Sequence, residues 1–281
     1  MINAKSEFDW SVAMRQFLLA AVLFGAVSTA HAADLPFLRG GFSDGLTKTT
    51  TNWQGFYAGG QGGLGTTDMD FTNTTSTLVQ RLLFNTAILS DGGLATWPMN
   101  TPTSVHGNGY GAFAGYNWQW DDVVVGLELN YMHGKFGGSQ TVEQTRNFTD
   151  GTGAQDFVTY QSTAKVNLTD LGSLRARAGY AMGVFLPYAF GGVALGQADI
   201  VRTARVFGTQ IDPTTKQAFP FDVQATDAQN SKYVNGYVGG LGMDVMLMAC
   251  LFLRAEWEFA HYTPVIPTTV NTVRVGLGYK F

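Results

Sequence analysis

The chain has 281 residues, of which 45% are hydrophobic and only 14% are charged, whereas a soluble domain typically has about 25% charged residues. The net charge of −4 provides no basic surface for nucleic acid, and the single cysteine, Cys250, excludes an internal disulfide framework and a multi-cysteine metal site. The 35 glycines and 13% aromatic residues, together with the low charge, are typical of a β-protein in an apolar solvent.

The first 32 residues predict an export signal. Lys5 and Arg15 precede an apolar run over residues 17–27, and small residues follow up to Ala30-His31-Ala32. A basic segment, a short apolar segment and an Ala-X-Ala sequence together make a secretory signal peptide. The apolar run is shorter than the roughly 20 residues that a membrane-spanning helix needs, so an N-terminal anchor is the less favoured alternative.

The rest of the chain alternates apolar and polar residues with the period of two that predicts β-strands. Over residues 123–131, Val125, Leu127 and Leu129 fall on one face, whereas Glu128 and Asn130 fall on the other. Residues 250–260 and 272–281 alternate in the same way. Segments richer in glycine predict five further strands, at residues 54–65, 107–118, 166–181, 186–198 and 231–243.

These segments predict an all-β fold, an eight-stranded antiparallel up-and-down transmembrane β-barrel. The strand that begins at residue 123 runs on to the long connection at residue 136, so each strand has ten or more residues, the length that a tilted strand needs to cross a bilayer. The connections over residues 119–122, 182–185 and 244–249 are short, whereas those over residues 66–106, 136–165 and 199–230 are long and polar. Outer-membrane barrels have short periplasmic turns and long extracellular loops. We therefore predict a signal peptide over residues 1–32, a periplasmic segment over residues 33–52, and a barrel over residues 53–281 in the outer membrane of a Gram-negative cell.

The two faces of each predicted strand differ in polarity. Lipid-facing side chains must be apolar because the bilayer core offers no water, so the charged and glycine-rich face lines the interior. By this parity, seven charged residues are predicted to lie inside the barrel: Glu128, Arg175, Arg177, Arg254, Glu256, Glu258 and Arg274. An eight-stranded barrel has just enough room for side chains to fill, so we expect these charges to pair into a packed ionic plug. A small ion-selective pore is the alternative.

The last predicted strand carries the most specific local pattern. Apolar residues occupy every second position up to the final aromatic residue: Val273, Val275, Leu277, Tyr279 and Phe281. This pattern looks like the signal by which the barrel-assembly machinery recognises outer-membrane proteins. The alternative is an ordinary terminal strand.

Several segments resemble a known family. Trp53-Gln54-Gly55-Phe56-Tyr57-Ala58-Gly59-Gly60 resembles the first strand of the alphaproteobacterial small outer-membrane barrels, the porin-family or outer-membrane immunogenic proteins, which are similar in architecture to OmpA, OmpX and Opa barrels. Residues 171–180 and 186–194 look like the fourth and fifth strands of that family. The resemblance departs at residues 66–106 and 244–249. It implies outer-membrane lipids and lipopolysaccharide as partners, periplasmic chaperones and the assembly machinery during biogenesis, and an extracellular partner contacted through the loops.

The sequence predicts no enzymatic reaction, no cofactor and no metal site. The three histidines beyond the predicted signal peptide are interpreted as rim or loop residues: His106, His133 and His261. Four loop carboxylates lack the spacing of a calcium-binding loop: Asp68, Asp70, Asp150 and Asp156. We therefore expect a non-enzymatic protein that acts in outer-membrane structure and in surface interaction through its loops. A small porin, and a barrel whose loops bind a ligand such as haem, are the alternatives.

Overall fold

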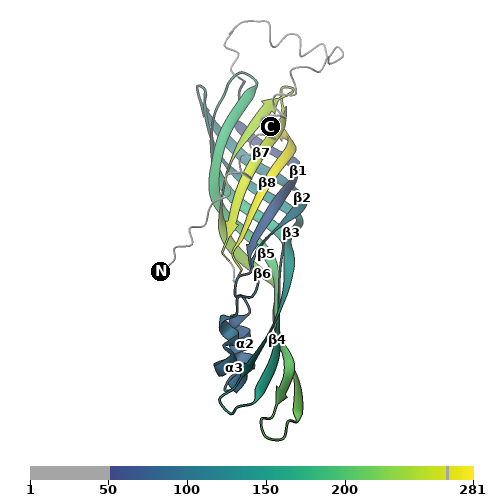
Figure 1. The fold of residues 1–281 in the computed structure, drawn as a ribbon. Helices are drawn as coiled ribbons and strands as arrows, with labels where there is room; N and C mark the ends of the chain where they lie inside the picture. The colour runs from purple at the N-terminus through teal and green to yellow at the C-terminus, as the bar shows by residue number, and fades with distance from the viewer. Residues whose placement is uncertain (1–50, 264–265) are drawn as a thin grey trace, which may run out of the picture. The chain divides into compact units, whose positions relative to one another are not determined.

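The computed structural model describes residues 51–263 and 266–281 (Figure 1). The predicted signal peptide and almost all of the predicted periplasmic segment lie outside the described residues. Within the described ranges, no helix is both long and apolar enough to span a membrane. The strands of the described chain form a closed barrel in which each pairs with the next, and the last pairs with the first.

The barrel has eight antiparallel strands among the described residues, as the sequence predicted. They are β1 (Gly55–Asp70), β2 (Pro102–Trp120), β3 (Val123–Thr149), β4 (Gln155–Tyr180), β5 (Phe185–Ile211), β6 (Ala218–Met246), β7 (Leu251–Tyr262) and β8 (Thr268–Lys280). Loop 1 (residues 71–101) connects β1 to β2 and contains two short helices, α2 (Ser76–Leu82) and α3 (Ala87–Gly92), and a 3-10 turn, η2 (Leu94–Thr96).

The outward side chains of the barrel are mostly apolar, whereas the interior holds charged and polar side chains together with aromatic and aliphatic ones. On β3, Leu127 and Leu129 are 50% and 64% exposed, whereas Glu128 between them is buried. Inward glycines make room for rings from neighbouring strands. A Cβ atom on Gly242 would collide with the ring of Tyr188, and one on Gly278 would collide with the ring of Phe252. The high glycine content therefore reflects a narrow interior that is packed with side chains.

Strands β3 to β6 are longer than the sequence indicated, with 27, 26, 27 and 29 residues. Residues 136–165 and 199–230 were expected to be polar loops, and for most of their length this expectation is wrong. They continue the four strands into a sheet beyond the barrel, with turns confined to residues 150–154 and 212–217. We call residues 136–149, 155–167, 199–211 and 218–230 the outer sheet.

The outer sheet and loop 1 form a second hydrophobic core. Inward side chains of the outer sheet, including Val158, Tyr160 and Val206, are fully or almost fully buried. They belong to one cluster with Leu78 of α2 and Trp97 of loop 1. In Figure 1, α2 and α3 lie beside the extended strands, at the end of the barrel opposite the C-terminus. Loop 1 is therefore a packed element of this region.

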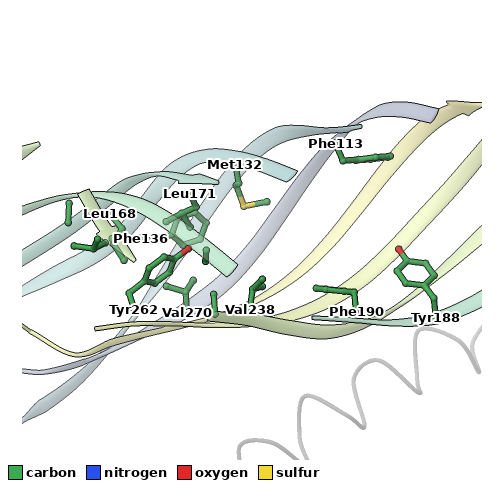
Figure 2. Close-up of a cluster of buried hydrophobic side chains, with 14 of the residues drawn as sticks. Phe113, Met132, Phe136, Leu168, Leu171, Tyr188, Phe190, Val238, Tyr262 and Val270 are labelled. Carbon is green, nitrogen blue, oxygen red and sulfur yellow. The ribbon is translucent and has the colours of Figure 1, made fainter. Parts of the chain in front are cut away.

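The barrel interior has apolar groups on both sides of a polar layer. Figure 2 shows Phe136, Leu168 and Tyr262 grouped on one side, with Tyr188 and Phe190 some way along the barrel from them. The first group lies towards the outer sheet, and the second lies towards the short turns. The charged side chains described below occupy the space between them.

Candidate functional site

Strand parity places every charged residue that the sequence assigned to the interior inside the barrel. The structure adds an eighth, Asp244, which lies near the end of β6 and points inward. The ionic network consists of four carboxylates and four arginines: Glu128, Asp244, Glu256, Glu258, Arg175, Arg177, Arg254 and Arg274. None of the eight is more than 4% exposed. Their formal charges therefore sum to zero in a space closed to water.

Arg175 is the centre of the network. Its guanidinium donates from Nε to Glu128 Oε1 (2.9 Å) on the neighbouring strand β3. It also donates from Nη2 to Glu256 Oε2 and from Nη1 to Glu258 Oε2, both at 2.8 Å. Glu256 and Glu258 belong to β7, which does not pair with β4, so this side chain crosses the lumen. One arginine therefore links opposite walls of the barrel.

Arg254 and Arg177 share the fourth carboxylate, Asp244, towards the short turns. Arg254 binds Asp244 through two bonds, Nε to Oδ1 (2.9 Å) and Nη2 to Oδ2 (3.0 Å), and donates from Nη1 to Glu128 Oε2 (2.7 Å). Arg177 donates from Nη2 to Asp244 Oδ2 (2.7 Å). Such forked pairs are the strongest hydrogen bonds available to a guanidinium. Asp244 was expected in a turn over residues 244–249. This expectation is wrong because β6 continues to Met246.

Arg274 completes the network on β8. It forms an ion pair with Glu258, and its Nη1 donates to Asn130 Oδ1 (2.9 Å). The register sets Arg274 beside Glu256, but the Glu256 carboxylate accepts from Arg175 instead. The long side chains therefore pair with residues across the lumen as well as with the residues directly opposite them on the neighbouring strand.

Aromatic rings enclose the guanidinium groups. The Arg177 guanidinium lies 3.8 Å from the centroid of the Tyr188 ring, and that of Arg254 lies 3.9 Å from the centroid of Phe113. The Tyr57 hydroxyl donates to Glu128 Oε2 (2.7 Å), and the Tyr188 hydroxyl donates to Glu256 Oε1 (2.6 Å). The carboxylates are thus engaged by arginines and tyrosines, which is the arrangement of a structural network rather than of a general acid or base awaiting a substrate.

The histidines lie apart from the network, on the outward side of the strands. His133 Nδ1 is 2.9 Å from Asp170 Oδ1, whose carboxylate also accepts from the Tyr131 hydroxyl. His261 Nδ1 is 2.9 Å from Thr269 Oγ1 on β8. These contacts join each histidine to a neighbouring strand and do not bring His133 and His261 together. Among the described residues, no group of three histidine, cysteine or acidic side chains forms a metal site.

The comparison with protein families decides what kind of barrel this is. Residues 17–281 match the family model described as the outer membrane protein beta-barrel domain. The chain belongs to this family. The protein is accordingly an outer-membrane β-barrel protein, and the outer sheet and loop 1 extend from the end that carries the long connections, which in such barrels is extracellular.

Several curated proteins are similar to this chain. The 25 kDa outer-membrane immunogenic protein of Brucella ovis is 29% identical over 171 residues, which are 61% of this chain and 62% of that protein. The 31 kDa outer-membrane immunogenic protein of Brucella melitensis is 28% identical over 184 residues, which cover 61% and 65% of the two chains. The matched part of the chain thus spans less than two thirds of these relatives.

Two solved structures match most of the chain with low TM-scores. OprG of Pseudomonas aeruginosa is 15% identical, with a TM-score of 0.38, over 81% of this chain and 96% of that one. Ail, the attachment invasion locus protein of Yersinia pestis, is 11% identical, with a TM-score of 0.35, over 81% and 99% of the two chains.

Proposed function

We propose that this protein is a non-enzymatic outer-membrane protein whose filled barrel anchors a packed extracellular sheet, and that it acts in outer-membrane structure and in surface interaction. The observation that carries the proposal is the ionic network. Eight buried charges that neutralise one another leave the lumen without an evident path for ions. A barrel built in this way is suited to holding an extracellular element in place.

The outer sheet supports the part of the proposal that concerns the surface. Its outward face presents threonines that pair across strands: Thr141 with Thr163 (3.0 Å), Thr145 with Thr159 (2.9 Å) and Thr203 with Thr226 (3.1 Å), measured between Oγ1 atoms. The inward face is buried under loop 1. A polar, ordered face held beyond the membrane is accessible to partners without any rearrangement of the barrel.

Photo-crosslinking on intact cells tests this role. A photoreactive residue at Thr145, on the outward face of the outer sheet, should give adducts with molecules outside the membrane. The same residue at Leu129, which is on the same strand and 64% exposed on the lipid-facing surface, should give adducts with lipid or lipopolysaccharide only. If both positions give the same lipid adducts, the outer sheet does not stand clear of the membrane, and the proposed surface role is wrong.

We also propose that the C-terminal strand carries the assembly signal. Val273, Val275, Leu277 and Tyr279 are half exposed on the lipid-facing side of β8, and Phe281 is 75% exposed at its end. An exposed apolar face of this kind suits recognition by the assembly machinery and by periplasmic chaperones. Replacing Phe281 by Asp should reduce the amount of folded barrel in the membrane fraction without affecting export, whereas Phe281→Tyr should assemble normally. Normal assembly of Phe281→Asp contradicts the proposal.

A further inference from the structure

The tip of the outer sheet contains a buried carboxyl group. Asp156 lies on the inward face of β4, directly between Phe148 on β3 and Gln210 on β5. Its side chain is fully buried, and neither of its carboxyl oxygens has a hydrogen-bond partner among the described residues. A negative charge in such a place is costly, because burial removes its water and no donor or cation replaces that water. The position of Asp156 therefore favours the neutral, protonated acid.

Helix α3 of loop 1 lies beside this part of the sheet (Figure 1). A Cβ atom on Gly92, the last residue of α3, would collide with the ring of Phe148, so the helix and the sheet are in direct contact there. Asp91 Oδ2 accepts a hydrogen bond from the backbone amide of Gly151 (2.8 Å) in the turn between β3 and β4. These two contacts keep α3 against the tip, an arrangement that we call the closed tip.

The carboxylate of the turn, Asp150, has partners that Asp156 lacks. Its Oδ1 accepts hydrogen bonds from the hydroxyl of Thr152 (2.6 Å) and from the backbone amides of Thr152 and Ala154 (both 2.9 Å). The bond from the Thr152 hydroxyl contributes most to holding the pKa of Asp150 below its usual value. Its Oδ2 accepts from the side-chain amide of Gln210 (3.1 Å). The amide that lies opposite Asp156 is thus engaged by Asp150, which stays ionised.

The elements packed against Asp156 offer it no positive charge. Each contributes a neutral or an acidic group: Phe148 from β3, Gln210 from β5, Asp91 from α3 and Asp150 from the turn. The cation on the inward face of β3, Arg146, lies with its guanidinium 4.7 Å from the centroid of the Trp97 ring. Burial, followed by the charge of Asp150, raises the pKa of Asp156. Both causes oppose ionisation while the tip is closed.

Helix α3 is also the part of loop 1 that is held least firmly. None of its residues is buried, whereas α2 buries Leu78 and Val79 in the second hydrophobic core. Elements with few buried apolar contacts open locally at low cost. An opening at the tip should therefore be confined to α3 and the β3–β4 turn, while α2 and the barrel keep their places.

We propose that the carboxyl group of Asp156 is a proton-dependent latch for loop 1, buried and protonated while the tip is closed, and ionised and in contact with water when α3 separates from the tip. The proton passes to the solvent. Because the closed tip binds the proton more tightly than the open tip, closure is favoured most at low pH. That advantage is lost as the pH rises through the closed-state pKa. The latch would make the arrangement of loop 1 depend on the external pH, whatever the partner of the surface is.

Amide hydrogen exchange tests the latch in the full protein folded into phosphatidylcholine vesicles. Exchange is measured from about pH 4 to pH 8, and each rate is divided by the intrinsic rate at that pH. Protection of residues 87–92 and 150–156 should fall by up to about tenfold per pH unit as the pH rises, and should become constant above the closed-state pKa. Protection of residues 123–131 in the barrel should not change.

Neutral substitutions of Asp156 should abolish this pH dependence. Asp156→Asn, which keeps the shape but cannot ionise, and Asp156→Val should both leave the tip protected over the whole pH range. Asp222→Asn is the matched control, because Asp222 is an exposed carboxylate of the outer sheet paired with Arg205, and it should titrate as the wild type does. Asp91→Ala should lower the protection of the tip at every pH and leave its pH dependence in place, because Asp91 holds α3 to the turn.

Three results would overturn the proposal. The first is a wild-type tip whose protection is the same at every pH. The second is an Asp156→Asn variant with the pH dependence of the wild type, which would assign the titration to another group. The third is a tip that stays open at every pH in both neutral variants of Asp156, which would mean that a neutral side chain at this position does not close it.

Discussion

Strands β3 to β6 pass through two environments, the barrel and the outer sheet. The outward face is apolar in the barrel and polar in the outer sheet, and the inward face changes in the opposite sense. In the barrel, outward Leu129 and Leu174 are half or more exposed, and inward Glu128 and Arg175 are buried. In the outer sheet, the outward face carries threonines, whereas inward Val158 and its neighbours are buried under loop 1. The period of two is unchanged. What changes is the medium outside, lipid in one region and water in the other.

The two regions also differ in what holds them together. The barrel interior depends on charges that compensate one another, whereas the region beneath loop 1 depends on apolar burial. A buried ion pair adds little over an apolar replacement of the same shape, but removal of one partner is costly. Variants that remove one charge should therefore show the largest difference in stability loss between the barrel interior and the outer sheet.

The largest effect is expected from Arg175→Met. This substitution leaves three buried glutamates without their shared partner, so it should lower the free energy of unfolding by at least about 3–5 kcal/mol in urea titrations in vesicles. Arg205→Met is the matched control. Arg205 pairs with Asp222 on the exposed face of the outer sheet, where removal of an ion pair costs about 0–1 kcal/mol. Equal costs for the two variants would mean that the barrel interior is hydrated.

Trp97→Ala should damage the second region alone. Trp97 is 2% exposed and belongs to the cluster between loop 1 and the outer sheet. Loss of a buried Trp costs about 3–5 kcal/mol, here in the free energy of local opening. External protease should then cut within residues 76–96, while the barrel keeps its wild-type urea midpoint. A global loss of stability would show that the two regions unfold together.

The exchange of polarity along β3 can be tested with one residue type at two positions. Leu129→Arg places a charge in lipid and should cost about 2–4 kcal/mol near the midplane. Thr145→Arg, on the same outward face but in the outer sheet, should change the free energy of unfolding by no more than about 0.5 kcal/mol. Similar costs at both positions would place the membrane boundary elsewhere on β3.

The pairing within the network predicts a smaller effect. The ion pair of Arg274 with Glu258 should give a coupling energy of about 0.5–3 kcal/mol in a double-mutant cycle of Arg274→Met and Glu258→Gln. The cycle of Arg274→Met with Glu256→Gln should give less, because the Glu256 carboxylate bonds to Arg175 and Tyr188. Stronger coupling of Arg274 to Glu256 would mean that the strand register determines the partner of Arg274, and that contacts across the lumen do not.

The barrel was predictable from the sequence because each membrane strand must keep one face apolar. The same rule failed beyond the membrane. In residues 136–165 the outward positions carry polar residues such as Thr and Gln, and the inward positions carry apolar residues such as Val. A strand whose outward face is polar cannot face lipid, so this segment was taken for a polar loop. The sequence of loop 1 also contains a pattern that predicts a helix, because apolar residues recur at the spacing of a helix face: Leu78, Val79, Leu82 and Leu83.

The interior charges were predictable by parity, but their partners were not. Asp244 was missed because the predicted strand ended at residue 243 and left Asp244 in the connection over residues 244–249, whereas β6 continues to Met246. The crossing of the lumen by Arg175 depends on barrel closure and strand tilt, which no local pattern encodes. The aromatic members of the layer, Tyr57 and Tyr188, were likewise hidden because neutral residues occur on either face of a strand. Asn130 was placed on the same face as Glu128, but its bond to Arg274 could not be foreseen.

Conductance across planar lipid bilayers tests the closed barrel most directly. The folded wild type should give no single-channel steps above the bare membrane in concentrated potassium chloride, because the ionic network and the apolar groups around it fill the lumen. The same preparation must migrate as folded barrel on an unheated gel. Reproducible steps from folded wild-type protein would contradict the account and would identify the protein as a small porin.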